Sequence, residues 1–344
     1  MHRTAAIAVA VLALLGCQSE PEILPLPGDP ANFAPLEKYE AMKIPADNAM
    51  TVEKAHLGRL LFWDKRLSGD GKLSCYSCHL NENGLTDGKA LNEGAFGKKL
   101  TRSSPTLWNI GYHSEFYWDG RAKTLEAQAK AAWTGVNMGA AKPEEIVAKL
   151  NAIPAYGDQF KKVFNEAATV DNVLKALACY MRTIISKQTP FDKWQRGDAT
   201  AVSDSAKRGY DAFKKAKCDN CHVGFLLTSQ QYYNVGIGMK AEKPDLGRFN
   251  ASKLDKDKGA FKAPTLRDVA RSAPYFHDGS VATLEEAVKL MVGGGIDNPN
   301  IDKANLAKAD LSDVEVKDLI EFLKSLSETT MLKEPALPPD PAPK

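Results

Sequence analysis

The apolar positions along the chain recur at helical spacing in several segments, and this pattern predicts a mainly α-helical fold. The apolar side of the first segment, residues 51–63, is formed by Leu57, Leu60, Leu61 and Phe62. The same periodicity predicts helices over residues 123–133, 143–151, 170–186 and 205–216. A capping box, Ser312-Asp313-Val314-Glu315, opens a final helix that is expected to reach Leu326. No stretch alternates clearly enough to predict a strand.

The stretches between these helices are polar, and two of them are long. Residues 81–104 and 223–262 carry no periodic apolar pattern. Because such loops are uncommon in a compact domain, we expect them to wrap around a cofactor that supplies the missing core. Residues 189–204 are predicted to connect two domains, 46–190 and 200–328. The proline-rich end, residues 329–344, is predicted to be a disordered tail.

The N-terminus has the pattern of an export signal. Arg3 precedes an apolar run, residues 5–15, that is too short to span a membrane. The run ends in Leu14-Leu15-Gly16-Cys17, which resembles a bacterial lipobox, so residues 1–17 are expected to be a signal peptide and Cys17 to carry a lipid. A secretory signal cut nearby is the alternative. Residues 18–45 are predicted to be a flexible tether, and the expected location is periplasmic, as an outer-membrane lipoprotein.

The chemistry of the chain is concentrated in a motif that occurs twice. Cys75-Tyr76-Ser77-Cys78-His79 and Cys218-Asp219-Asn220-Cys221-His222 are both C-x-x-C-H, the attachment motif of c-type heme. Four thiols, those of Cys75, Cys78, Cys218 and Cys221, would bind two hemes covalently, and His79 and His222 would each bind an iron. Zinc half-sites or redox dithiols are the alternative. Zinc needs four ligands packed together, however, and a redox dithiol requires no histidine.

The two motifs belong to a longer internal repeat. Pro105-Thr106-Leu107 matches Pro264-Thr265-Leu266, and Thr124-Leu125-Glu126 matches Thr283-Leu284-Glu285 at the same offset. A duplicated unit with one heme per copy explains this regularity. At two positions the copies differ in chemistry: Trp118 and Ala132 in the first copy stand where His277 and Met291 stand in the second.

The difference between Ala132 and Met291 predicts that the second heme iron has two protein ligands and that the first has one, which leaves the first heme open on one face. Met291 precedes a glycine run and offers a thioether, and a Met/His ligand pair raises the potential of a heme. Met239 is the alternative ligand. Ala132 cannot bind iron, so the first heme keeps one face free.

The net charge bears on possible partners, and the cysteine count shows how many thiols are left without a role. The net charge of +2 over 344 residues argues against a nucleic-acid partner. Of the 6 cysteines, Cys179 alone belongs to neither the signal nor a heme motif. It lies in an apolar helical pattern and is expected to be a buried, unreactive side chain.

Three further stretches resemble the bacterial diheme cytochrome c peroxidase family, which includes the MauG-like enzymes. They are Tyr117-Trp118-Asp119-Gly120-Arg121, Leu125-Glu126-Ala127-Gln128-Ala129 and Ala273-Pro274-Tyr275-Phe276-His277-Asp278-Gly279. The resemblance covers residues 46–328. It implies two cytochrome c-like domains, an active site at the His79 heme and electrons that enter at the His222 heme. It also implies that Trp118 couples the hemes and that Gln128 lies in the distal pocket. For His277 the alternatives are a contact with a heme propionate, a contact with the other domain, or a buried histidine with satisfied hydrogen bonds and no function.

Two departures from the family pattern bear on mechanism. No histidine lies between His79 and His113 to cap the first iron, so that heme is expected to be open without reductive activation. Asn137 stands where the family has a distal glutamate, and an amide cannot shuttle protons. Either Glu115 or Glu126 replaces the missing carboxylate through an ordered water, or turnover of peroxide is slow.

The resemblance further implies a calcium ion between the domains. The matching positions here are the side chain of Ser103 and the carbonyls of Ser272 and Pro274. Ser103 is a shorter and weaker oxygen ligand than the asparagine of the family, and calcium prefers six to eight oxygens.

The sequence therefore predicts an exported enzyme that reduces hydrogen peroxide to water with electrons from a small c-type cytochrome or a cupredoxin. A homodimer is among the expected forms. Two other functions stay open: a MauG-like enzyme that uses peroxide to oxidise a partner protein, and a diheme electron-transfer cytochrome without catalysis.

Overall fold

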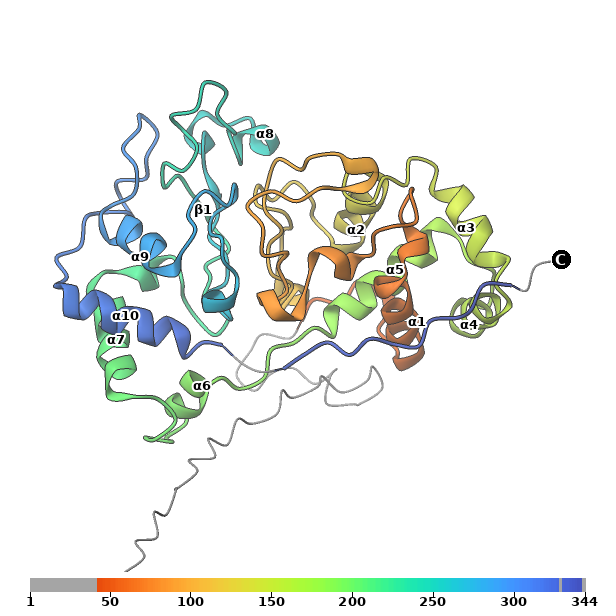
Figure 1. The fold of residues 1–344 in the computed structure, drawn as a ribbon, viewed down its shortest axis with the longest axis horizontal. Coiled ribbons are helices and arrows are strands. Elements are labelled where there is room, and N and C mark those ends of the chain that lie inside the picture. The colour runs from red at the N-terminus through yellow and green to blue at the C-terminus, as the bar shows by residue number, and fades with distance from the viewer. Residues whose placement is uncertain (1–41, 328–329, 342–344) are drawn as a thin grey trace, which may run out of the picture.

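The computed structural model describes residues 42–327 and 330–341, and helices dominate it, as the sequence predicts (Figure 1). The expected signal peptide, Cys17 and the tether up to residue 41 lie outside the described residues. Within the described ranges, no helix is both long enough and apolar enough to span a bilayer.

The first half of the chain builds one core from five helices. These are α1 (Val52–Trp63), α2 (Leu125–Thr134), α3 (Pro143–Asn151), α4 (Pro154–Phe164) and α5 (Val170–Arg182). Helix α1 packs against α5 at Gly58, where a Cβ would overlap the carbonyl oxygen of Ala176. This close approach allows the buried side chains of both helices to form a single apolar cluster.

The second half repeats this plan with its own core. Its helices are α6 (Pro190–Gln195), α7 (Asp204–Lys215), α8 (Phe249–Ser252), α9 (Leu284–Val292) and α10 (Asp313–Lys324). Helix α7 packs against α10 at Gly209, where a Cβ would overlap the carbonyl oxygen of Asp318. Two short strands, β1 (Tyr232–Tyr233) and β2 (Phe261–Lys262), pair antiparallel with Tyr232 opposite Lys262, although no strand was predicted.

Most predicted helices form close to their expected bounds, and the differences have local causes. Helix α5 ends at Arg182 rather than at residue 186 because Asn109 binds the chain beyond it: its Nδ2 donates to the Ser186 hydroxyl, and its Oδ1 accepts from the Ser186 amide. Helix α4 was missed. Its signals were Pro154 at the first helical position and the four-residue spacing of the buried Tyr156 and Phe160.

The prediction of a disordered tail is wrong for residues 330–341. This segment runs back from the second half and lies along the first half (Figure 1). Leu332 is buried in the first core, and its amide and carbonyl exchange hydrogen bonds of 2.8 and 2.9 Å with the side chain of Asn81. The guanidinium of Arg59 donates to the Lys333 carbonyl. These buried partners outweigh the proline-rich composition on which the prediction rested.

Candidate functional site

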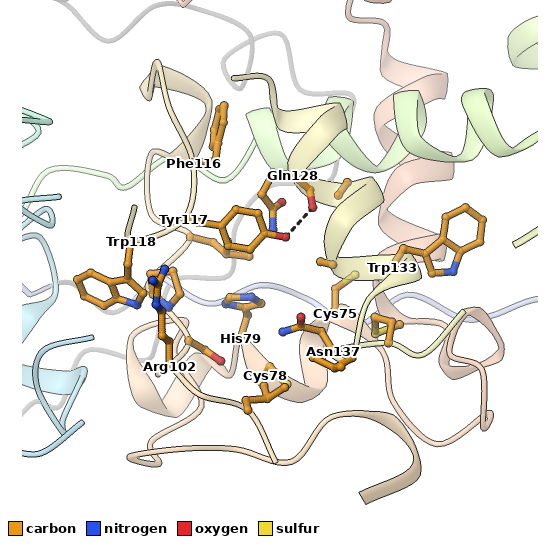
Figure 2. A pocket seen from close by; sticks show the side chains of 18 of the residues that line it. Cys75, Cys78, His79, Arg102, Phe116, Tyr117, Trp118, Gln128, Trp133 and Asn137 are labelled. Atoms are coloured by element: carbon orange, nitrogen blue, oxygen red, sulfur yellow. Dashed lines mark hydrogen bonds between the residues drawn. The ribbon is translucent and has the colours of Figure 1, made fainter. Parts of the chain in front are cut away.

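The first C-x-x-C-H motif lines a cavity of about 790 Å³ in the first half. Pockets of 300–1,000 Å³ are typical of cofactor sites. The lining includes six of the residues predicted to act at the first heme, namely Cys75, Cys78, His79, Trp118, Gln128 and Asn137. Figure 2 shows these side chains gathered around His79. The structure therefore brings these six side chains to one cavity.

His79 is fixed in one orientation by the backbone. Its Nδ1 donates to the carbonyl of Leu85 at 2.9 Å, so Nε2 is the nitrogen left to bind a metal. Burial lowers the pKa of His79, which keeps the ring neutral as ligation requires. The turn that carries it, Cys75–Cys78, begins with a capping box between Ser74 and Ser77. Tyr76 stacks on Trp63 with ring centroids 3.6 Å apart and holds this turn against α1.

The cysteines do not have the character of a redox or zinc site. Burial raises the pKa of Cys75 to about 12 and that of Cys78 to about 11. Redox-reactive cysteines need a lowered pKa. Among residues 42–327 and 330–341, no group of three or more histidine, cysteine or acidic side chains could hold a metal ion. The thiols and His79 instead fit a group that binds sulfur covalently and takes one histidine.

The second motif repeats the geometry of the first. It follows α7, and its His222 donates from Nδ1 to the carbonyl of Leu227 at 3.1 Å. Burial lowers the pKa of His222 as well, and the Pro264 carbonyl faces it as the Pro105 carbonyl faces His79.

The backbone confirms that the halves are copies. Left-handed conformations recur at matching positions, which are Leu85 and Leu227, Asn109 and Asp268, Tyr117 and Phe276, and Gly120 and Gly279. Such conformations are rare outside glycine, so a shared set indicates a common local structure.

The lining of the cavity also includes the amides of Gln128 and Asn137 and the phenol of Tyr117. Tyr117 donates from its hydroxyl to the carbonyl of Gln128 at 3.1 Å, and the guanidinium of Arg121 lies 3.5 Å from the centre of its ring. Burial raises the pKa of Tyr117, so the phenol stays protonated. Sequence reasoning gave Tyr117 no role, although it lies in the stretch that carries Trp118.

Neither of the carboxylates expected to replace the distal glutamate lines the cavity. Glu126 binds Arg182 and Asn48, and Glu115 binds Lys123, Arg248 and Tyr232. The acidic residues that do line it, Asp119 and Asp245, are both paired with Arg102, at 2.7 and 2.6 Å. The cavity thus has no unpaired carboxylate among its lining residues.

Trp118 lies at the edge of the cavity, where the two halves meet. Its indole Nε1 donates to the Ser103 carbonyl at 2.9 Å, and its own carbonyl accepts from the amide of Lys262 at 2.8 Å. His277, its counterpart in the repeat, is buried and stacks on Phe261 with ring centroids 3.6 Å apart. The His277 carbonyl accepts from the Ser103 amide, so this segment contacts the other half.

The positions matched to calcium ligands come to this same boundary. The Ser103 hydroxyl donates to the carbonyl of Phe276 at 2.8 Å, two residues beyond Pro274. The Ser272 hydroxyl donates to the carbonyl of Val269. The hydrogen bond of Ser103 joins the halves directly.

The two methionines considered as axial ligands lie in different surroundings. Met291 is half-buried on α9, one turn from Val288 in the second core. Met239 packs onto Gly259, where a Cβ would overlap its sulfur.

Fold and site together define a helical protein of two related halves, each with a cysteine-histidine motif on a short turn. The sequence model of the di-haem cytochrome c peroxidase family matches residues 52–200. A cytochrome-c peroxidase IdrP1 from Denitromonas iodatirespirans is 37% identical over 90% of this chain and 91% of its own. The methylamine utilization protein MauG of Methylophilus methylotrophus is 35% identical over 90% of this chain and 93% of its own.

A solved structure shares the fold. It is a MauG-like protein associated with microbial copper homeostasis, 34% identical, covering 85% of this chain and 95% of its own with a TM-score of 0.78. This chain belongs to the diheme cytochrome c peroxidase family of oxidoreductases, and the family implies heme c as cofactor. The family and the enzyme class predicted from the sequence are confirmed.

Proposed function

We propose that this protein reduces hydrogen peroxide to water with electrons from a small c-type cytochrome or a cupredoxin. The observation that carries the proposal is the cavity that a fixed, neutral His79 shares with Gln128, Asn137 and Tyr117. Relatives named cytochrome c peroxidase, 34–37% identical over most of the chain, support it.

The cofactors are two hemes, one in each of two cytochrome c-like domains. Cys75 and Cys78 would hold the first and Cys218 and Cys221 the second through thioethers, with His79 and His222 on the irons. When bound, the heme iron supplies the Lewis-acid and redox chemistry of peroxide reduction. The residues fit this group because the half-buried thiols have raised pKa values and are neutral, and the histidine rings each present Nε2.

The side chains of the cavity would bind and orient peroxide rather than relay its protons. The amides of Gln128 and Asn137 can donate to one peroxide oxygen and accept from the other. The Tyr117 phenol keeps its proton and lies between Gln128 and Arg121. Apolar neighbours such as Leu107 and Trp133 exclude water from this face.

In the second domain Met291 would complete the coordination of the iron. That iron could then not bind peroxide and would instead receive electrons from the donor. Trp118 would couple the domains, because it lines the first cavity and bonds through its carbonyl to Lys262 of the second half. A calcium ion held by Ser103 and by the carbonyls of Ser272 and Pro274 would stabilise this boundary. Metal analysis before and after chelation tests that part of the proposal.

Export belongs to the same proposal. Heme c is attached outside the cytoplasm, and the N-terminal pattern up to Cys17 is that of an exported lipoprotein. A periplasmic enzyme anchored to the outer membrane would meet both peroxide and small redox proteins.

A MauG-like oxidation of a partner protein is the second candidate, because Asn137 replaces an acid–base residue and a slow reaction favours a long-lived oxidised state. A non-catalytic electron-transfer cytochrome is the third. Absorption and spin-resonance spectra of the isolated protein separate the electron-transfer role from the two enzymatic ones, and peroxide-dependent modification of a partner protein identifies the MauG-like enzyme. One high-spin and one low-spin heme, with the high-spin signal changing on addition of peroxide, supports an enzyme. Two low-spin hemes inert to peroxide would leave only the electron-transfer role.

A further inference from the structure

A buried hydrogen bond joins the two halves at Trp108 and Asp268. Trp108 is 1% exposed, and its Nε1 donates to Oδ2 of Asp268 at 3.1 Å. Asp268 is 2% exposed and follows the second copy of the Pro-Thr-Leu motif, as Trp108 follows the first. The bond therefore links equivalent segments of the duplicated fold.

From Trp108 a chain of hydrogen bonds leads to His79. The Trp108 amide donates to the Thr106 hydroxyl at 3.2 Å, and that hydroxyl donates to the Gly84 carbonyl at 2.7 Å. Leu85, the next residue, accepts from His79. A peptide bond joins Gly84 to Leu85, and the other links between side chain and backbone in this chain are hydrogen bonds.

From Asp268 the same chain leads to His222. The amide of Arg267 donates to the Thr265 hydroxyl at 3.1 Å, and that hydroxyl donates to the Leu226 carbonyl at 2.5 Å. Leu227, the next residue, accepts from His222. The two arms thus mirror each other and meet at Trp108 and Asp268, and neither includes Trp118.

Asp268 can accept a proton where it lies. Its Oδ1 accepts no hydrogen bond from the described residues, and Arg271 approaches Oδ2 only to 3.4 Å. Burial raises the pKa of Asp268 to about 6, with Arg271, Trp108 and Ser327 opposing the rise. A buried carboxylate that lacks full pairing gains by taking up a proton.

We propose that Trp108 and Asp268 form a second redox-active pair between the two histidine centres. The inference rests on the proposed peroxidase function, since hydrogen peroxide is the oxidant. Trp108 loses one electron to the first site after that site has reacted with peroxide, and its indole proton passes to Oδ2 of Asp268. A neutral tryptophan radical and a carboxylic acid result. An electron from the donor, entering at His222, reduces the radical, and the proton returns to Nε1.

The test is spin resonance on the full-length protein with both hemes, frozen after one equivalent of peroxide without donor. Tryptophan deuterated on the indole ring identifies the radical by narrowing its signal. We expect an indole radical that persists in Trp118→Phe and is lost in Trp108→Phe. Asp268→Asn keeps a hydrogen-bond acceptor but cannot take the proton, and should lose the Trp108 component while folding normally.

Trp63→Phe is the matched control. Trp63 is also buried and lies outside the cavity lining, but its Nε1 donates to no carboxylate among the described residues. The Trp108 radical should persist in this variant. Two results would overturn the proposed redox role of Trp108 and Asp268 and leave the proposed function intact. One is a Trp118→Phe protein that reacts optically with peroxide but forms no indole radical. The other is a Trp108 radical signal that Asp268→Asn leaves unchanged. Absence of any optical reaction in the wild type would overturn both.

Discussion

Glu126 is bound by Arg182, whose guanidinium donates to its two carboxylate oxygens at 2.7 and 3.1 Å. Asn48 adds a third hydrogen bond to the same carboxylate. Burial would raise the pKa of Glu126, but these partners outweigh it and lower the pKa. The carboxylate is thus committed to holding α2 against α5 and does not reach the cavity. Peroxide chemistry in this protein must proceed without it.

Introducing an acid–base group at Asn137 should accelerate the reaction with peroxide. A positioned group of this kind is worth about 10²–10⁴-fold in rate. We expect Asn137→Glu to raise the rate of heme oxidation in stopped-flow measurements by about 10²-fold. Asn137→Gln, which adds the same length without a titratable group, is the control and should give no such gain. An already fast wild-type reaction that Asn137→Glu leaves unchanged would show that another residue moves the protons.

The first heme should bind exogenous ligands in the fully oxidised protein. His79 is the only histidine lining the described cavity, and His113 is held at the boundary of the halves, where Lys262 donates to its Nδ1 at 3.0 Å. Cyanide titration followed by absorption should show binding without prior reduction. Binding that appears only after half-reduction would mean that some other side chain caps this iron.

Replacing Met291 should change the second heme alone. Because Met/His ligation raises heme potential, Met291→Ala is expected to make this heme high-spin and to lower its potential. The near-infrared charge-transfer band of methionine-ligated heme should disappear. Met239→Ala is the matched control and should keep the band. The opposite pattern, with the band lost only in Met239→Ala, would assign the ligand to the loop methionine.

The C-terminal segment should contribute to stability. Leu332 is buried in the first core, so Leu332→Ala is expected to cost about 2–5 kcal/mol in the free energy of unfolding. The measurement is denaturant unfolding of the first half, followed by a local probe such as Trp63. Leu254→Ala, at an exposed leucine, should change stability by less than about 0.5 kcal/mol. Equal effects of the two changes would mean that the segment does not pack as described.

The sequence was informative where structure depends on local periodicity or on motif spacing. Helix α3 begins at Pro143 and ends at Asn151, as predicted, because its start signal and apolar spacing are local. The packing of residues 330–341 could not be predicted, since its partners Arg59 and Asn81 are hundreds of positions away and no periodicity marks them. Composition alone favoured disorder there.

In the site, too, features set by local spacing were predicted and long-range contacts were not. The C-x-x-C-H spacing placed Cys75, Cys78 and His79 together, and the family pattern placed Gln128 and Asn137 opposite them. The pairing of Glu126 with Arg182 was beyond sequence reasoning, because an ion pair depends on which helix faces meet across the core. The bond between Trp108 and Asp268 joins the two halves of the chain and has no sequence signal of its own.

The central claim, that the protein is a peroxidase, is tested most directly by steady-state turnover. The full-length protein with both hemes is mixed with hydrogen peroxide and a reduced small c-type cytochrome, and oxidation of the cytochrome is followed optically. We predict sustained turnover with two cytochromes oxidised for each peroxide consumed, and loss of turnover in His79→Gly. Failure to oxidise either a cytochrome or a cupredoxin, by a protein whose two hemes are in place, would contradict the account.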